Sequence, residues 1–335
     1  MLKSFKIVFF LTTIMGTLIT ISANSWMSMW MGLEINLLSI LPLLSSNNQA
    51  NSIEASIKYF ITQVLASNII LMSILCTFNF NSQIDQMPAM FKILQSAIFL
   101  KMGAAPFHSW FPEVLEGLSW MNCLMILTWQ KIAPMIILMN SIKQEMFIYS
   151  IMIMSMLIGG ILGFNQMSIR KIMAYSSINH VGWMIAAMMS TKTLWITYFC
   201  IYFVISLNII LIMNQMNVKN ISQLTMLFKQ TKFMGLIFSM NFLSLGGLPP
   251  FLGFFPKWLA IQQMLVMNEM ALALIMIILT LVATFFYLRL SLVPMMMANK
   301  VDLGKNSMKM NFYLALSNYL SIISLITCAI LLNPM

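Results

Sequence analysis

The sequence predicts an all-α polytopic membrane protein, and three observations carry that prediction. Of its 335 residues, 60% are hydrophobic and only 8% are charged, whereas a soluble domain carries about 25% charged residues. Long apolar stretches recur along the chain, separated by short polar connections. Two of these stretches are interrupted by glycine and proline beside a lysine. We therefore expect a single membrane domain over residues 1–335, with no soluble domain.

The apolar stretches predict about 11 membrane-spanning segments, because one membrane helix needs about 20 apolar residues. The first stretch follows Lys3 and Lys6 and resembles a signal peptide, but its apolar run is long for one, so we interpret it as the first membrane helix. The expected segments are 5–23, 26–45, 55–78, 88–111, 120–140, 147–165, 171–189, 194–214, 233–264, 271–293 and 311–332.

Two of these segments cannot be continuous helices. In residues 88–111, a glycine and a proline follow Lys101 within five residues, and in residues 233–264 a Gly-Gly-Leu-Pro-Pro run precedes Lys257. Proline removes a helical hydrogen bond and clashes with the preceding turn, so we expect a broken helix near 88–111 and another near 233–264. A pair of such interruptions in the two halves of a chain is typical of transporters built from repeats.

The rest of the composition excludes several classes of function. The net charge of +10 is explained by lysines gathered on one side of a membrane, so we expect no nucleic-acid partner. No Cys-x-x-Cys pair is present, which disfavours zinc and iron–sulfur sites. The 37 methionines are better explained as interchangeable apolar residues than as a copper site. We expect no metal, and disulfides lack support. The cysteines are Cys76, Cys123, Cys200 and Cys328.

Basic residues are distributed unevenly between the loops. With the expected segments, eleven of the 18 lie in the loops or at segment ends on the same side as the N-terminus, three lie likewise on the opposite side, and four lie deeper within segments. This asymmetry sets orientation, and it predicts that the loops 215–231 and 294–310 share the face of Met1. The eleven are Lys3, Lys6, Lys58, Arg170, Lys171, Lys219, Lys229, Lys232, Lys300, Lys305 and Lys309; the three are Lys92, Lys143 and Lys192.

Few ionisable residues lie within the expected segments, and they are the candidate site. A charged side chain at the centre of a membrane helix costs roughly 2.5–3.5 kcal/mol on insertion scales, and such residues usually mark ion or proton pathways. For any one of them, snorkelling or local pairing is the structural alternative. The candidates are Glu34, Lys101, Lys131, His180 and Lys257.

These side chains favour proton transfer rather than bond-making catalysis. Burial favours the neutral form of a lysine and a nearby carboxylate favours its charged form, so Glu34 and Lys101 form a candidate switch pair. An imidazole takes up and releases protons near neutral pH, and His180 follows polar residues at 176–179 that could hold water. The sequence contains no Ser-His-Asp triad, phosphate-binding loop or dinucleotide fingerprint.

Four other residues in these segments carry structural or ambiguous interpretations. Arg289 lies near the end of its segment, where an arginine snorkels to the membrane surface. Asn36 and Pro42 are explained by a hydrogen bond between helices and by a kink. His108 either caps the first broken helix or lies at a proton entry.

In combination, several stretches resemble the subunit 2 family of mitochondrial NADH dehydrogenase (ubiquinone), an antiporter-like membrane subunit of respiratory complex I. The family has a glutamate–lysine pair, a second lysine and a histidine along a hydrophilic axis, and a further charge in the second broken helix. The resemblance gives these roles to Glu34, Lys101, Lys131, His180 and Lys257. The matching stretches, which run across most of the chain, are 30–38, 101–117, 127–134, 174–183 and 241–258.

The resemblance implies a fold of two inverted five-helix repeats, each with a broken helix. It implies a complex that oxidises NADH, reduces ubiquinone and pumps protons across the mitochondrial inner membrane, with this N-terminus on the matrix side. It places NADH, FMN, iron–sulfur clusters and ubiquinone in other subunits, and makes neighbouring antiporter-like subunits and lipids the partners. Subunit 4 typically has glutamate where Lys257 stands here, which favours subunit 2.

Two other functions are compatible with the same residues. One is a free-standing cation/proton antiporter subunit, which would be active without redox subunits. The other is a non-pumping membrane scaffold, for which replacing Lys101, Lys131 or Lys257 would change assembly but not pumping. The proteins that co-purify with the chain would separate these alternatives.

Overall fold

The described part of the chain is helical and contains one isolated β-bridge, between Ser168 and Asn220. This confirms the predicted all-α fold class. The chain divides into two compact units, Met1–Met154 (unit 1) and Ser155–Met335 (unit 2), and each is considered by itself. The structure is a computed structural model, and it describes residues 2–45, 50–79, 87–141, 146–224, 232–249 and 251–296.

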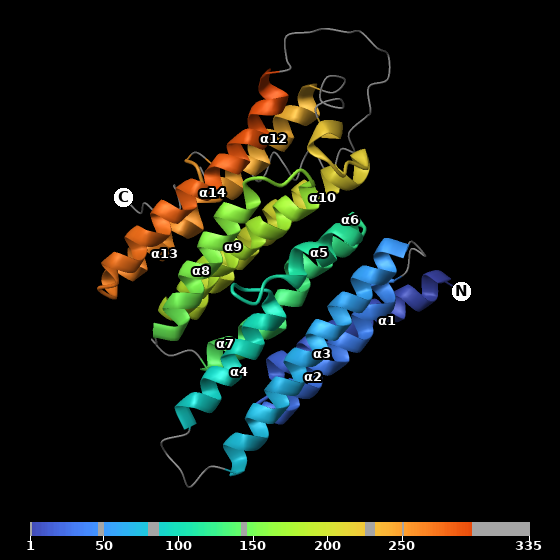
Figure 1. Cartoon of the computed structure of the whole chain (residues 1–335), viewed down its shortest axis with the longest axis vertical. Coiled ribbons are helices and arrows are strands. Elements are labelled where there is room, and N and C mark those ends of the chain that lie inside the picture. The colour runs from blue at the N-terminus through green and yellow to red at the C-terminus, as the bar shows by residue number, and fades with distance from the viewer. Residues whose placement is uncertain are drawn as a thin grey trace, which may run out of the picture. The chain divides into compact units, whose positions relative to one another are not determined.

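Unit 1 begins with three long helices that run side by side (Figure 1): α1 (Leu2–Ser22), α2 (Trp26–Leu44) and α3 (Ala50–Asn79). The first two approach closely, because a Cβ atom on Gly16 would lie only 2.8 Å from the backbone nitrogen of Asn36. Small residues allow such approach between membrane helices. The outer face of α1 exposes large apolar side chains, including Phe5, Leu11 and Leu18, as a lipid-facing helix requires.

The first broken helix consists of α4 (Met87–Met102) and α5 (Trp110–Gly117), joined by residues 103–109. It lies where the sequence predicted a break, but its second half extends beyond residue 111. Gly103 ends α4 at φ +72°, a conformation that glycine adopts without penalty. Its N–H donates to the carbonyl of Leu100 (3.1 Å) and that of Ala104 donates to Phe99 (3.0 Å), which together make a Schellman motif.

The segment expected at 120–140 contains a change of helix type. Its parts are α6 (Trp120–Leu124), the π-helix η2 (Met125–Trp129) and α7 (Gln130–Ser141). Pro134 lies inside α7 and has no N–H for the carbonyl four residues earlier. Short π-helices frequently occur at functional sites, and Gln130 and Lys131 follow this one directly.

Unit 2 is organised around α9 (Ile169–Ser190), which packs against α10 (Lys192–Met216), α13 (Phe254–Val266) and α14 (Met270–Met296). Nearly every residue of α9 from Ile172 to Met188 is buried, the polar ones included. A helix that is buried all round belongs to the centre of its unit. The helix α8 (Met146–Gly163) begins in unit 1 and ends in unit 2.

The second broken helix consists of α12 (Lys232–Gly246) and α13, with the backbone non-helical in the described residues between them. Its first half, α12, ends in the same way as α4. Gly247 has φ +77°, its N–H donates to the carbonyl of Ser244 (3.0 Å), and that of Leu248 donates to Leu243 (3.4 Å). The two breaks therefore share one Schellman motif.

Seven helical segments within the described residues are long and apolar enough to cross a membrane. The half-helices α4, α12 and α13 are each shorter than a membrane span, because their stretches are broken. The central helix α9 is long enough but carries many polar residues. The expected segment 311–332 lies outside the described residues, as does most of the loop 294–310.

Candidate functional site

Lys101 and Lys131 lie in the wall of one cavity inside unit 1. Lys101 is the penultimate residue of α4 and is 7% exposed; Lys131 is the second residue of α7 and is 2% exposed. The cavity has a volume of about 20 Å³, and a polar cavity above about 10–15 Å³ can hold one water molecule. Its other polar side chains are Asn36, Tyr59, Gln63 and Gln130.

Aromatic side chains of α5 form the apolar wall of this cavity. The ammonium of Lys131 lies 5.4 Å from the centre of the Phe111 ring, within the range of a cation–π contact. The indole N–H of Trp110 donates to the carbonyl of Leu100 (3.1 Å) in the last turn of α4. The second half of the broken helix, α5, therefore caps the last turn of α4 and positions the Phe111 ring beside Lys131.

Amide side chains connect the helices around the cavity. The hydroxyl of Tyr59 donates to Oε1 of Gln130 (3.3 Å), and Nε2 of Gln130 donates to Oδ1 of Asn36 (2.9 Å). The predicted interhelical hydrogen bond of Asn36 is therefore confirmed. Nε2 of Gln63 donates to the backbone carbonyl of Lys101 (3.3 Å). Tyr59 and Gln63 were not predicted from the sequence, because they lie on the long apolar α3 with no motif around them.

Glu34 lies outside this cavity, on the half-buried part of α2. It is near enough to Lys101 for an electrostatic interaction between the two side chains. However, no ion pair within 4.0 Å joins Glu34 to Lys101, both of which are described residues. The predicted Glu34–Lys101 pair is therefore an interaction across a gap rather than a direct contact.

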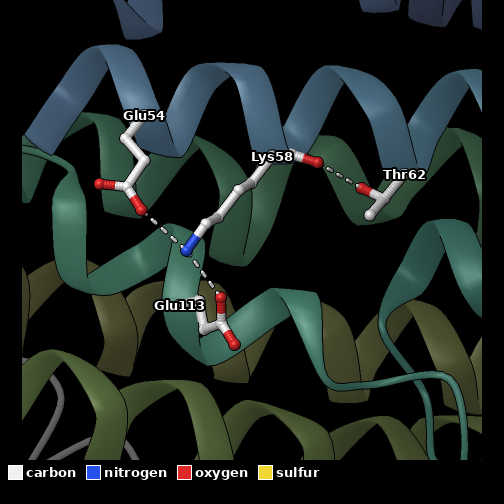
Figure 2. Close-up of polar contacts among 4 residues, drawn as sticks. All are labelled: Glu54, Lys58, Thr62 and Glu113. Atoms are coloured by element: carbon white, nitrogen blue, oxygen red, sulfur yellow. Dashed lines mark hydrogen bonds and ion pairs between the residues drawn. The ribbon is translucent and has the colours of Figure 1, made fainter.

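An exposed ion-pair cluster fastens α5 to α3 (Figure 2). The ammonium of Lys58 on α3 lies 3.0 Å from Glu54, one turn earlier, and 2.8 Å from Glu113 on α5. All three side chains are substantially exposed, so water and salt weaken their attraction. The i,i+4 spacing of Glu54 and Lys58 is readable from the sequence, but the partner on α5 is not.

Lys257 faces the interior of unit 2, as predicted, and binds the end of α12. It is 7% exposed, and its ammonium donates to the carbonyls of Gly246 (2.8 Å) and Leu245 (3.3 Å). A Schellman motif leaves these two carbonyls without backbone partners. In unit 1 the carbonyl of Lys101 has the same place in the motif as that of Leu245, and it receives the uncharged amide of Gln63 instead.

His180 is buried on α9, with 5% of its surface exposed. Its Nδ1 lies 2.9 Å from the hydroxyl oxygen of Tyr198 on α10, and its ring centre lies 5.1 Å from that of Tyr202. Polar residues before it on α9, such as Ser176 and Ser177, are buried with it. No sequence signal pointed to Tyr198, because eighteen residues and a turn separate it from His180.

His108 and Arg289 contact backbone carbonyls. Nδ1 of His108 lies 3.2 Å from the carbonyl of Pro106, within the first break, a local contact that both the capping interpretation and a proton entry allow. Nη2 of Arg289 donates to the carbonyl of Gln166 (2.9 Å), after the end of α8, in keeping with its predicted structural role. Among the described residues, no three His, Cys, Asp or Glu side chains gather in a way that could hold a metal ion.

The chain is similar to known proteins in both sequence and fold. Residues 23–286 match the family described as NADH:quinone oxidoreductase/Mrp antiporter, TM. The chain is 48% identical over 324 residues to NADH-ubiquinone oxidoreductase chain 2 of Anopheles gambiae, covering 95% of this chain and 92% of that protein.

Two solved structures share the fold at low sequence identity. A chain of respiratory complex I from Thermus thermophilus superposes with a TM-score of 0.86 at 21% identity, over 98% of this chain and 79% of that chain. A chain of the Mrp complex from Dietzia sp. superposes with a TM-score of 0.72 at 16% identity, over 89% of this chain and 61% of that chain. On its sequence, the chain belongs to the NADH:quinone oxidoreductase/Mrp antiporter family and, within it, to the NADH-ubiquinone oxidoreductase chain 2 proteins.

Proposed function

We propose that this chain is the proton-translocating membrane subunit of an NADH:ubiquinone oxidoreductase, complex I, in the mitochondrial inner membrane. Other subunits oxidise NADH, carry FMN and the iron–sulfur clusters, and reduce ubiquinone; this chain carries no redox centre. The observation that supports the proposal best is that Lys101 and Lys131 line one small cavity inside the helix bundle. Burying two lysines in the interior of a membrane bundle is costly, and side-chain packing alone does not explain it, whereas a proton pathway does.

In unit 1 the proton passes between the two lysines. A charged lysine donates hydrogen bonds and accepts none, whereas its neutral amine has a lone pair. The ammonium of Lys101 gives a proton to a water in the cavity, and that water gives a proton to the neutral amine of Lys131. Glu34 influences the step from outside the cavity, because a nearby carboxylate stabilises an ammonium. A movement that separates the two weakens this stabilisation and favours release of the proton.

In unit 2 the residues that we assign to proton transfer are His180 and Lys257. Both side chains are buried, and they lie on α9 and α13, which pack against each other. An imidazole can take up a proton at one ring nitrogen and release one from the other. Glu34, Lys101, Lys131, His180 and Lys257 are thus the residues to which we assign proton translocation.

The basic loops support an orientation with the N-terminus in the matrix, because lysine-rich loops stay on the side from which a membrane protein is inserted. The apolar outer face of α1 supports contact with lipid. Neighbouring antiporter-like subunits of the complex are the partners we propose for the half-buried Glu34.

The test uses the assembled complex in liposomes, with NADH oxidation and proton uptake measured together. We expect Lys101→Met and Lys131→Met to assemble and to lower pumping coupled to NADH oxidation several-fold, and Glu34→Gln to act in the same direction. Lys92→Met is the matched control, because Lys92 lies on the same helix α4 but is exposed. If the three variants assemble and keep the full proton yield per NADH, the residues are structural and the proposal is wrong.

A second candidate is cation/proton antiport, favoured by the fold shared with a chain of the Mrp complex. It requires proton movement that depends on a sodium or potassium gradient and continues without NADH. Purified complex with its redox subunits inactive distinguishes the two: cation-dependent proton flux supports antiport, and its absence supports pumping driven by electron transfer.

A further inference from the structure

The hydrogen bonds around the unit 1 cavity can run in either of two directions. In the structure the chain of donors starts at Tyr59, passes through Gln130 and ends at Asn36. An amide carries both an acceptor and donors, and a phenol can donate or accept. If the amides of Gln130 and Asn36 both rotate by half a turn, Asn36 donates to Gln130 and Gln130 donates to Tyr59. Every bond is then retained with its direction reversed.

Reversal changes what Tyr59 offers to the cavity that it lines. In the first arrangement its hydrogen is engaged by Gln130, so only its oxygen lone pairs remain for a neighbour. In the reversed arrangement the oxygen accepts from Gln130, and the hydrogen is free for a cavity water or a neutral amine. The first arrangement suits a donor in the cavity, and the second suits an acceptor.

We propose that Tyr59, Gln130 and Asn36 form a reversible hydrogen-bond relay that orients one water between Lys101 and Lys131, with Gln130 as its positioning residue. The inference rests on the proposed proton path through these lysines. The cavity volume of about 20 Å³ limits it to about one water, which needs two to four polar partners. Gln130 directly precedes Lys131 and follows the π-helix η2, so the same local backbone positions the relay and the lysine.

An apolar replacement tests the relay without adding charge. Gln130→Met keeps the approximate size of the side chain and removes both hydrogen bonds, and Tyr59→Phe removes only the hydroxyl. Gln95→Met is the matched control, because Gln95 is also buried in unit 1 and donates one hydrogen bond, to the carbonyl of Ser141 (2.9 Å), but does not line the cavity.

We expect Gln130→Met and Tyr59→Phe each to lower the pumping rate of the assembled complex at least twofold, and the double variant to be no slower than the slower single one. The solvent deuterium isotope effect on pumping should rise in both, because proton transfer through the cavity becomes limiting. A purely structural role would lower the amount of assembled complex without raising the isotope effect.

The relay is refuted if both variants assemble and match Gln95→Met in rate and isotope effect while Lys131→Met fails to pump. If Lys131→Met also pumps normally, the proposed function falls as well, so the two failures are distinguishable. If Gln130→Met fails to assemble, the rate and isotope effect of Tyr59→Phe alone test the relay, because that variant removes a single oxygen atom and leaves the ring in place.

Discussion

The hydroxyl oxygen of Tyr198 lies 2.9 Å from Nδ1 of His180, and both side chains are buried where α9 packs against α10. A neutral ring nitrogen without hydrogen accepts from the phenol, whereas a protonated one donates to it. Each protonation at Nδ1 of His180 therefore requires the Tyr198 hydroxyl to turn its hydrogen elsewhere. The orientation of the phenol hydroxyl therefore depends on whether Nδ1 of His180 carries a hydrogen.

The first prediction is that Tyr198→Phe assembles but pumps several-fold more slowly per NADH oxidised. Only one hydrogen bond is lost, at a cost of about 1 kcal/mol in stability, so the fold should persist. His180→Ala should act in the same direction, and the double variant should be no worse than His180→Ala alone. Additive losses, or normal pumping by His180→Ala, would show that the pair serves only to join two helices.

The second prediction compares two buried lysines. Lys257→Met removes two hydrogen bonds from an ammonium to backbone carbonyls, each of a type worth roughly 1.5–3 kcal/mol. Relief of the buried charge offsets part of that loss. Lys101 makes no such bond within the described residues, so Lys101→Met should destabilise less. Thermal release of this chain from the solubilised complex measures the difference. Lys257→Arg, which keeps charged donors, should lie nearer the parent protein; equal effects of both methionine variants would contradict the comparison.

The third prediction concerns close packing within the second break. A Cβ atom added to Gly253 would overlap the carbonyl oxygen of Ser244, so Gly253→Ala must push α13 away from α12. Such overpacking costs typically 1–3 kcal/mol and sometimes more, and we expect little assembled complex on native gels. Gly160→Ala on α8 is the control. Its new atom would meet Val282 at 3.5 Å, an ordinary contact, and alanine is favoured over glycine in a helix by roughly 0.5–1 kcal/mol.

The fourth prediction concerns orientation in the membrane. Lys192 begins α10 and Lys219 lies three residues after its end; α10 is a helix of 25 residues that is long and apolar enough to cross the bilayer. A membrane-impermeant thiol reagent should reach Lys219→Cys only from the matrix side and Lys192→Cys only from the other side. The parent protein, with its native cysteines, supplies the background. Labelling of Lys219→Cys only from the side opposite the matrix would reverse the predicted topology.

The sequence predicted those parts of the molecule that depend on local chemistry. The helix breaks at Gly103 and Gly247 were predictable because glycine and proline interrupt apolar runs there. The buried lysines were predictable because almost all residues around them are uncharged. The partners of these residues were not predictable. Gln63 and Tyr198 meet Lys101 and His180 only because separate helices pack together, and neither has a neighbour in sequence that marks it.

The π-helix before Gln130 was also missed. Hydropathy over residues 120–140 describes how apolar the helix is, but not how many residues each of its turns contains. A proline inside a membrane helix, here Pro134, shows that the ladder of hydrogen bonds is disturbed. How the disturbance is absorbed depends on the surrounding packing, which one sequence does not describe.

The carbonyl oxygens of Leu245 and Gly246 present partial negative charge to the ammonium of Lys257, and this charge does not change with pH. A carboxylate, in contrast, loses its charge when it binds a proton. The electrostatic environment of Lys101, which has Glu34 nearby, therefore depends on the protonation of another side chain. Amide dipoles are permanent, and their hold on an ammonium changes only when the atoms move apart. The break between α12 and α13 therefore ties this contact to backbone position: displacement of one half-helix from the other, rather than titration of a neighbour, would lengthen the hydrogen bonds of Lys257.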